Sequence, residues 1–577
     1  MGFLKQFNVL GCGIGPIVRA VARRSRVLVI HDQSVAAAGD AGSFDDYLYT
    51  ALAGVTSRMA GAWGSGRTSS GTTRPVAAAT GTLTNLSVGI PFEIYDRPAA
   101  VNPAKNTGSA YALLYDTAST AGDGTAGDPV PQLPCGSQEI IAGAASGPGN
   151  GQLFFTFTAT AHASISEQWQ LEQVRATFYW HEPAANNSGT KPITGGLTFA
   201  VGLARGSGTP TADVAVTGGT ANTIRKASTL VAAGAGLPKL GVISTGTGNA
   251  AKRIVPVGCL MESETATQGL TVLSFANPYT CANDYSVSNE PIANGGAWGL
   301  IAAGVGGGSG TIDAVILHIG CYITHGTDPP YDGNGEYFDG LDDVYDLLNG
   351  YYLGQTSASG LRGGNIAEQY NDFVHHVRID VGSPSHDGGI PVVIVRGCFA
   401  GSGATLAEAE KILEYWEKAI LWGIGLKRVV PGVDDTRYLQ FALPNCCYVN
   451  PWAGISCLEI LTGQGNRQFI KRNGTSFNGD WAASSVNTVG MIKVKPNAET
   501  YAKGNYGWWV CVRNHTAAAS GVDGPPGDEL QTGWLPVDFA LNDNGKAFVA
   551  NAIATQINTP SSRIDREWIR ARTRDNP

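Results

Sequence analysis

The sequence has few charged residues for its length. Lys, Arg, Asp and Glu together make up 15% of the 577 residues, whereas soluble proteins average about 25%. A surface with so few charges is typical of a protein covered by other subunits, and also of a Gly-, Ser- and Thr-rich extracellular β-protein. The net charge of -8 is spread along the chain without a basic face, so nucleic-acid binding is not expected.

Long apolar runs are also missing. No stretch of about 18 apolar residues is present to span a membrane, and residues 1–26 contain no apolar segment ahead of a cleavage site. We therefore expect no signal peptide, no transmembrane segment and no membrane partner. Basic residues gather in 1–26 and 561–577. We interpret these two segments as arms that dock on a neighbouring subunit, or as solvated helical ends.

The ten cysteines are scattered, and none forms a Cys-x-x-Cys pair. This spacing does not support a zinc site or a thioredoxin-like motif. The acidic segment nearest to a calcium loop, Asp328 to Asp343, departs from the EF-hand spacing. We therefore predict no metal and no cofactor.

The residue pattern divides the chain into an α/β part and a β part. In 76–334, short runs rich in aromatic and β-branched residues alternate with Gly, Asn, Pro and Ser clusters, as in antiparallel sandwiches or jelly rolls. In 335–560, strand and helix patterns alternate, which predicts a doubly wound parallel sheet. The apolar run Val27 to Ile30, within 27–75, supplies its first strand. We predict an α/β domain interrupted by an antiparallel β insertion of one or two sandwiches.

Four segments of the α/β part resemble, in this order, the blocks of the SGNH or GDSL hydrolase superfamily. They are "VLVIHDQS", "SASGLRGGN", "VVIVRGCFA" and "DFALNDNGKAFVANAIA". The resemblance implies a flavodoxin-like parallel sheet. It also implies esterase chemistry, in which a serine attacks an acyl carbon, a histidine held by an aspartate takes its proton, and an asparagine helps to bind the oxyanion.

The positions that the resemblance makes catalytic carry other residues. Gln33 stands at the nucleophile, and Phe399 stands at the oxyanion asparagine. Val537 and Ala540 stand at the aspartate and the histidine of the last block. Loss of nucleophile, donor, base and orienting group together predicts a catalytically inactive protein.

Three residues keep an enzymatic alternative open. Ser34 follows Gln33 directly, and either His31 or His515 could serve it as a base. Because successive side chains of an extended strand point to opposite faces, Ser34 needs a local turn to take the place of a nucleophile. The alternative function is a carbohydrate O-acetylesterase or another esterase.

Low charge, abundant Gly, a large β region and two basic arms together resemble a structural component of a tailed-phage virion. We predict a capsid decoration, head fibre or tail-associated protein, located in the virion or alternatively outside the cell, whose partners are further copies of itself and other virion proteins. A third possibility is a glycan-binding protein. In that case aromatic side chains would stack on sugar rings. The candidates are Trp169, Tyr179, Trp180 and Trp298.

Overall fold

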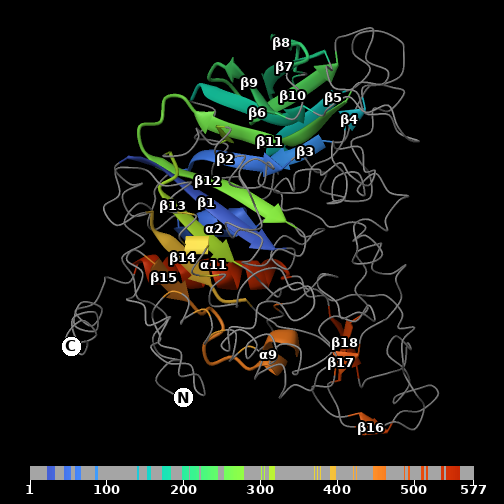
Figure 1. Ribbon diagram of the computed structural model, residues 1–577, viewed down its shortest axis with the longest axis vertical. Coiled ribbons are helices and arrows are strands. Elements are labelled where there is room, and N and C mark those ends of the chain that lie inside the picture. Colours follow the sequence, from blue (N-terminus) through green and yellow to red (C-terminus); the bar gives the residue numbers. More distant parts are fainter. Residues whose placement is uncertain are drawn as a thin grey trace, which may run out of the picture.

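The structure is a computed structural model (Figure 1). It describes residues 23–32, 44–52, 59–65, 85–88, 140–141, 152–157, 172–182, 198–206, 208, 210–219, 223–244, 253–277, 301, 304–305, 311–318, 370, 373–374, 377, 390–397, 413, 417, 420, 424, 446–462, 469, 486–487, 492–493, 508–511, 515–516, 534–537 and 541–558. Within this part of the chain, no helix is long and apolar enough to cross a membrane.

A mixed sheet of nine strands forms the centre of the fold. Its order is β15-β14-β13-β1-β12-β2-β11-β6-β9, and the short β4 (Ile140–Ile141) pairs with β11 beside this path. The bounds are β15 (Cys446–Val449), β14 (Val392–Val395), β13 (Ala314–His318), β1 (Arg24–Asp32), β12 (Gly269–Asn277), β2 (Met59–Ser65), β11 (Arg253–Ser263), β6 (Val174–Glu182) and β9 (Thr223–Val231).

The sheet is parallel from β15 to β2 and antiparallel from β2 to β9. In the parallel part, Val27 to Ile30 of β1 and Val392 to Val395 of β14 are almost fully buried. Continuous apolar runs of this kind are typical of parallel strands that are covered on both faces. The prediction that these two segments are parallel strands of one sheet is confirmed.

The expectation that 76–334 forms β structure separate from this sheet is wrong. Strands β12 and β13 both come from that range, and both pair with β1. Their sequences, "GLTVLSFAN" and "AVILH", are apolar and β-branched, and periodicity alone does not reveal which strand such a run will pair with. The division into domains, and a sandwich as an inserted unit, stay predictions.

A second sheet has five strands in the order β3-β5-β10-β7-β8. Their bounds are β3 (Asn85–Val88), β5 (Gln152–Phe157), β10 (Pro238–Ser244), β7 (Phe199–Arg205) and β8 (Val214–Val216). This sheet shares a hydrophobic core with β6 and β11 of the large sheet. Trp180 lies in that core, stacked on Phe178 and edge-on to Phe199.

A buried carboxylate lies next to Trp180 of this shared core. Glu182, 1% exposed, accepts hydrogen bonds from Trp180 Nε1 at 3.2 Å and from Arg225 NH1 at 3.3 Å. The Arg225 guanidinium also lies 5.2 Å from the centre of the Trp180 ring, which is within the range of a cation–π contact. The ion pair therefore joins β6 to its neighbour β9.

Helix α2 (Phe44–Leu52) is fixed to the large sheet by a hydroxyl group. Phe44, Leu48 and Leu52 are fully buried, and their spacing of four places them on one helix face. Tyr49 extends from the same helix to a bulge between β2 and β12. Its hydroxyl accepts a hydrogen bond from the Val272 N–H at 2.6 Å and donates one to the carbonyl of Gly61.

Helix α11 (Asp543–Asn558) packs beside α2 (Figure 1). The contacts at the start of this helix give a structural reason for the asparagine and the glycine of the segment "LNDNG". Asn542 accepts the Gly545 N–H at 2.9 Å and so caps the helix. A Cβ at Gly545 would lie 2.2 Å from the Phe469 carbonyl oxygen, so glycine is required for this close approach.

The remaining described elements are short. Helix α9 (Cys457–Thr462) starts with a capping box in which Ser456 Oγ and the Glu459 carboxylate bind each other's backbone N–H groups. Strands β16 (Val486–Asn487) and β19 (His515–Thr516) form one pair. Strands β17 (Ile492–Lys493), β18 (Trp508–Cys511) and β20 (Trp534–Val537) form a small antiparallel sheet.

Candidate functional site

The carboxyl ends of β1, β13, β14 and β15 meet at one edge of the sheet, because these strands are parallel neighbours. His31 near the end of β1 is in register with His318, the last residue of β13. His318 is in turn in register with Val395, and Val395 with Val449. Ligands of open α/β sheets bind at this kind of edge. It is therefore the candidate site, which we call the carboxyl edge.

His318 lies beneath the start of α2. Its side chain is fully buried, and its ring centre lies 5.3 Å from that of Phe44 at an interplanar angle of 51°. The sequence analysis did not identify this histidine. The available signal was a titratable residue that directly ends an apolar strand, "AVILH".

A polar cluster occupies the carboxyl ends of β14 and β15. Glu417 Oε1 accepts hydrogen bonds from the Tyr448 hydroxyl at 3.0 Å and from Asn450 Nδ2 at 3.1 Å. Arg396 NH1 donates to Asn450 Oδ1 at 3.3 Å and lies 3.9 Å from Glu417 Oε2. Burial, followed by the negative charge of Glu417, raises the pKa of the Tyr448 hydroxyl well above its ordinary value. These four side chains form a mutually bonded group, the Arg396 cluster.

Asn450 also fixes the chain just after β15. Its Oδ1 accepts the Trp452 N–H at 3.0 Å. The Trp452 ring packs against Phe469 and Phe548, at centre-to-centre distances of 5.5 and 5.2 Å. The Arg396 cluster is thus joined to the aromatic packing under α11, as expected of a structural element.

The sequence-predicted site residues are placed only in part. Gln33, Ser34, Phe399 and Ala540 lie outside the described residues. For three others the structure describes the backbone alone. These are His31 near the end of β1, His515 in β19 opposite Asn487, and Val537 in β20 opposite Trp508. The roles assigned to these seven residues therefore stay predictions.

In the strand order, the strand that precedes the oxyanion block implied by the resemblance is not next to β1. The block that contains Phe399 follows β14, and β13 separates β14 from β1. Since neighbouring strands lie about 4.8 Å apart, a segment that follows β13 starts nearer to the end of β1. That segment reads "IGCYI", with Gly320 followed two residues later by Tyr322, and it lies outside the described residues. Neither the segment after β14 nor the segment after β13 has an asparagine two residues after its glycine.

Two of the four aromatic residues that were candidates for glycan binding are buried. Trp180 and Tyr179 are 1% and 3% exposed, so neither offers a ring face to a sugar. Trp169, Trp298 and the acidic segment from Asp328 lie outside the described residues. Among the residues that are described, no three His, Cys, Asp or Glu side chains gather in a way that could hold a metal ion.

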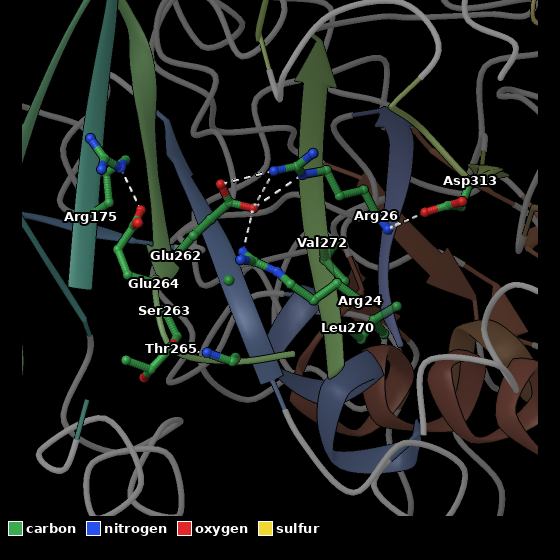
Figure 2. A network of polar contacts seen from close by, with 12 residues as sticks. Arg24, Arg26, Arg175, Glu262, Ser263, Glu264, Thr265, Leu270, Val272 and Asp313 are labelled. Carbon is green, nitrogen blue, oxygen red and sulfur yellow. Dashed lines mark hydrogen bonds and ion pairs between the residues drawn. The ribbon is translucent and has the colours of Figure 1, made fainter. Parts of the chain in front are cut away.

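An ion-pair network lies at the opposite, amino edge of β1 (Figure 2). Glu262 of β11 binds the Arg26 guanidinium with both oxygens, at 2.9 and 3.1 Å, and its Oε1 lies 3.1 Å from Arg24 NH2. The Arg26 N–H donates to Asp313 at 2.9 Å. To reach β1, the Glu262 side chain crosses β2 at Gly61, where a Cβ would lie 2.8 Å from Glu262 Cγ. Because the network lies away from the carboxyl edge, we assign it a structural role.

Comparison with known proteins gives weak likenesses. No protein-family model and no curated protein matches the sequence. The chain is similar to the solved structure of a peptidoglycan O-acetylesterase, with a TM-score of 0.35 and 11% identity over 77% of this chain and 83% of that one. It is also similar to the salicylyl-acyltransferase SsfX3 from a tetracycline biosynthetic pathway, with a TM-score of 0.18 and 11% identity over 51% and 75% of the two chains. At these TM-scores, neither structure assigns the chain to a family.

Proposed function

We propose that the chain is a structural or interaction protein built on an SGNH-like sheet that does not catalyse ester hydrolysis. The observation that carries this proposal is the Arg396 cluster. Its Arg, Glu, Asn and Tyr side chains bind one another at the carboxyl edge. Because these side chains bond to one another, none of these contacts needs a substrate or ligand to complete it.

The burial of His318 supports the same conclusion. A general base must come within hydrogen-bond reach of the proton that it removes. His318 is fully buried with its ring against Phe44, and is therefore covered on the side of α2. The substitutions Gln33, Val537 and Ala540 in the SGNH-like blocks also favour a protein without a catalytic triad.

The assembly that we propose is a virion, with other copies of the chain and other virion proteins as partners. The support is compositional. With 15% charged residues, much of the surface is suited to permanent contacts, whose centres are depleted of charge. A capsid decoration, head fibre or tail-associated protein fits this description.

Two measurements on the purified full chain test the proposal. Light scattering and electron microscopy should show a defined assembly, and a monomer at all concentrations would contradict the structural role. Hydrolysis of p-nitrophenyl acetate should equal the buffer rate, because loss of triad members costs factors of about 10⁴ to 10⁶. Turnover that disappears in Ser34→Ala but persists in the neighbouring control Ser43→Ala would contradict inactivity.

That last outcome would support the esterase alternative, which one observation favours. Strand β1 has parallel neighbours on both sides, and it ends with His31 and Asp32 at the carboxyl edge. Ser34 follows the strand end by two residues in the sequence. A nucleophile placed there would stand where open α/β sheets bind their ligands.

A further inference from the structure

Strand β9 is the last strand of the large sheet. It pairs with β6 along its full length, from Thr223 opposite Glu182 to Val231 opposite Val174. None of the other described strands pairs with it. An edge of nine residues without a proline is a template for further pairing, which proteins normally block or use.

The two faces of β9 differ. Ala227 and Val231 pack against the core that the two sheets share. On the alternate face, Lys226 is exposed and Leu230 is 40% exposed. Leu230 is the one large hydrophobic side chain among the described residues that is exposed to this degree. The exposed leucine thus lies on the strand edge that is available for pairing with another chain.

The second sheet ends on the same side of the molecule. Its last strand, β8, lies beside β9 (Figure 1). Side chains of β9 bind this region, since the Thr229 hydroxyl donates to the Asp213 carboxylate and Arg225 NH1 donates to the Thr217 carbonyl at 2.8 Å. A partner that pairs with β9 would therefore also meet the end of the second sheet, which enlarges the contact.

We propose that β9 pairs antiparallel with β9 of a second copy of this chain, about a two-fold axis through Ala227. This inference rests on the proposed assembly function and names the surface that it uses. In this register, Leu230 faces Ile224 of the other copy, and Lys226 faces Ser228 of the other copy. Aliphatic side chains are thus paired across the axis, and no cation stands directly opposite another.

The two neighbouring registers that keep the same faces together are less favourable. An axis through Lys226 would place the two Lys226 ammonium groups opposite each other, and like charges directly opposite are destabilising. An axis through Ser228 would place Lys226 opposite Leu230 and leave the exposed leucine without an aliphatic partner. Because directly opposite residues of an antiparallel pair point to the same face, the axis must pass through a residue rather than between two.

Cysteine cross-linking reads the register directly. Opposite residues of an antiparallel pair have Cα atoms about 4.5–5.5 Å apart, which suits a disulfide. The double variant Ile224→Cys/Leu230→Cys should give a covalent dimer on oxidation that a reducing agent removes. Within one copy these positions are about 20 Å apart along the strand, so they cannot bond to each other. Each single variant measures the background from the native cysteines.

The matched control is Lys226→Cys/Leu230→Cys, which should not cross-link above background unless the axis passes through Ser228 or through Lys226. The single variant Lys226→Cys tells these two registers apart, because it cross-links only when the axis passes through Lys226. A dimer from this control alone would overturn the proposed register, and no dimer from the double variant Ile224→Cys/Leu230→Cys would overturn the proposed pairing of β9 about Ala227. Circular dichroism checks that every variant is folded. Light scattering of the unaltered chain separates the two proposals, because assembly without cross-linking contradicts only the β9 interface, whereas a monomer contradicts the assembly function as well.

Discussion

Replacing Tyr49 by Phe should destabilise the large sheet at its bulge. In the pairing of β2 with β12, the register shifts between Leu270, opposite Met59, and Thr271, opposite Gly61. The Tyr49 hydroxyl lies at this irregularity, where it binds the Val272 N–H and the Gly61 carbonyl. One side-chain oxygen thereby supplies partners for two backbone groups beside the interrupted ladder.

The size of the effect follows from the burial of these groups. Val272 is 1% exposed, so its N–H cannot turn to bulk water when the hydroxyl is removed. A buried donor left unsatisfied costs about 1–3 kcal/mol, and the Gly61 carbonyl loses the hydrogen bond from Tyr49. We expect Tyr49→Phe to lower the free energy of unfolding by about 2 kcal/mol, because the aromatic ring keeps its packing and only the oxygen is lost.

Urea unfolding measures the total effect, and hydrogen exchange locates it. The urea midpoint should fall without a change in the m value, and the peptide that covers β12 should exchange faster. Tyr448→Phe is the control. It removes from β15, the end strand of the sheet and four strands away from β12, a hydroxyl that is bound to Glu417, and it should leave β12 exchange unchanged. A loss below about 0.5 kcal/mol, the range of ordinary surface substitutions, together with unchanged β12 exchange would refute the reasoning.

Two further predictions concern buried polar groups. Glu182→Ala should cost about 2–4 kcal/mol of stability, because Trp180 Nε1 and Arg225 each lose a bond to a buried carboxylate; Glu182→Gln, which keeps an acceptor, should cost less in urea unfolding, and equal losses would contradict this role. The raised pKa of Tyr448 means that the folded chain keeps the phenol proton when the unfolded chain releases it. The free energy of unfolding should therefore fall as pH rises above about 10, and less so in Tyr448→Phe; identical alkaline profiles would contradict the assignment.

The sequence predicted those buried strands that consist of a continuous apolar run. Val27 to Ile30 and Val392 to Val395 are such runs, and both lie in the parallel part of the sheet. The runs of β12 and β13 lie in 76–334, which was expected to form separate β structure. Pairing depends on contacts between residues far apart in the chain, which local composition does not encode.

The strand that leads to the carboxyl edge was predictable from the sequence, and the side-chain contacts at that edge were not. The apolar run Val27 to Ile30 predicted the first strand of the sheet, and His31 lies near the end of that strand, in register with His318 of β13. The Arg396 cluster was not predicted. Its side chains come from separate segments, with Glu417 and Tyr448 distant from Arg396 in the sequence. No local sequence motif therefore indicates that they are in contact.

The crossing of Glu262 over Gly61 has a mechanical consequence. Strand β1 is paired along its whole length with β12, and from Val27 to His31 with β13. A pull along its axis therefore loads those backbone hydrogen bonds together in shear. Through Arg24 and Arg26, part of the same load passes directly to β11, two strands beyond β12. Tension that enters the chain at Arg23 is thereby shared between the parallel and antiparallel parts of the sheet before any strand must slide.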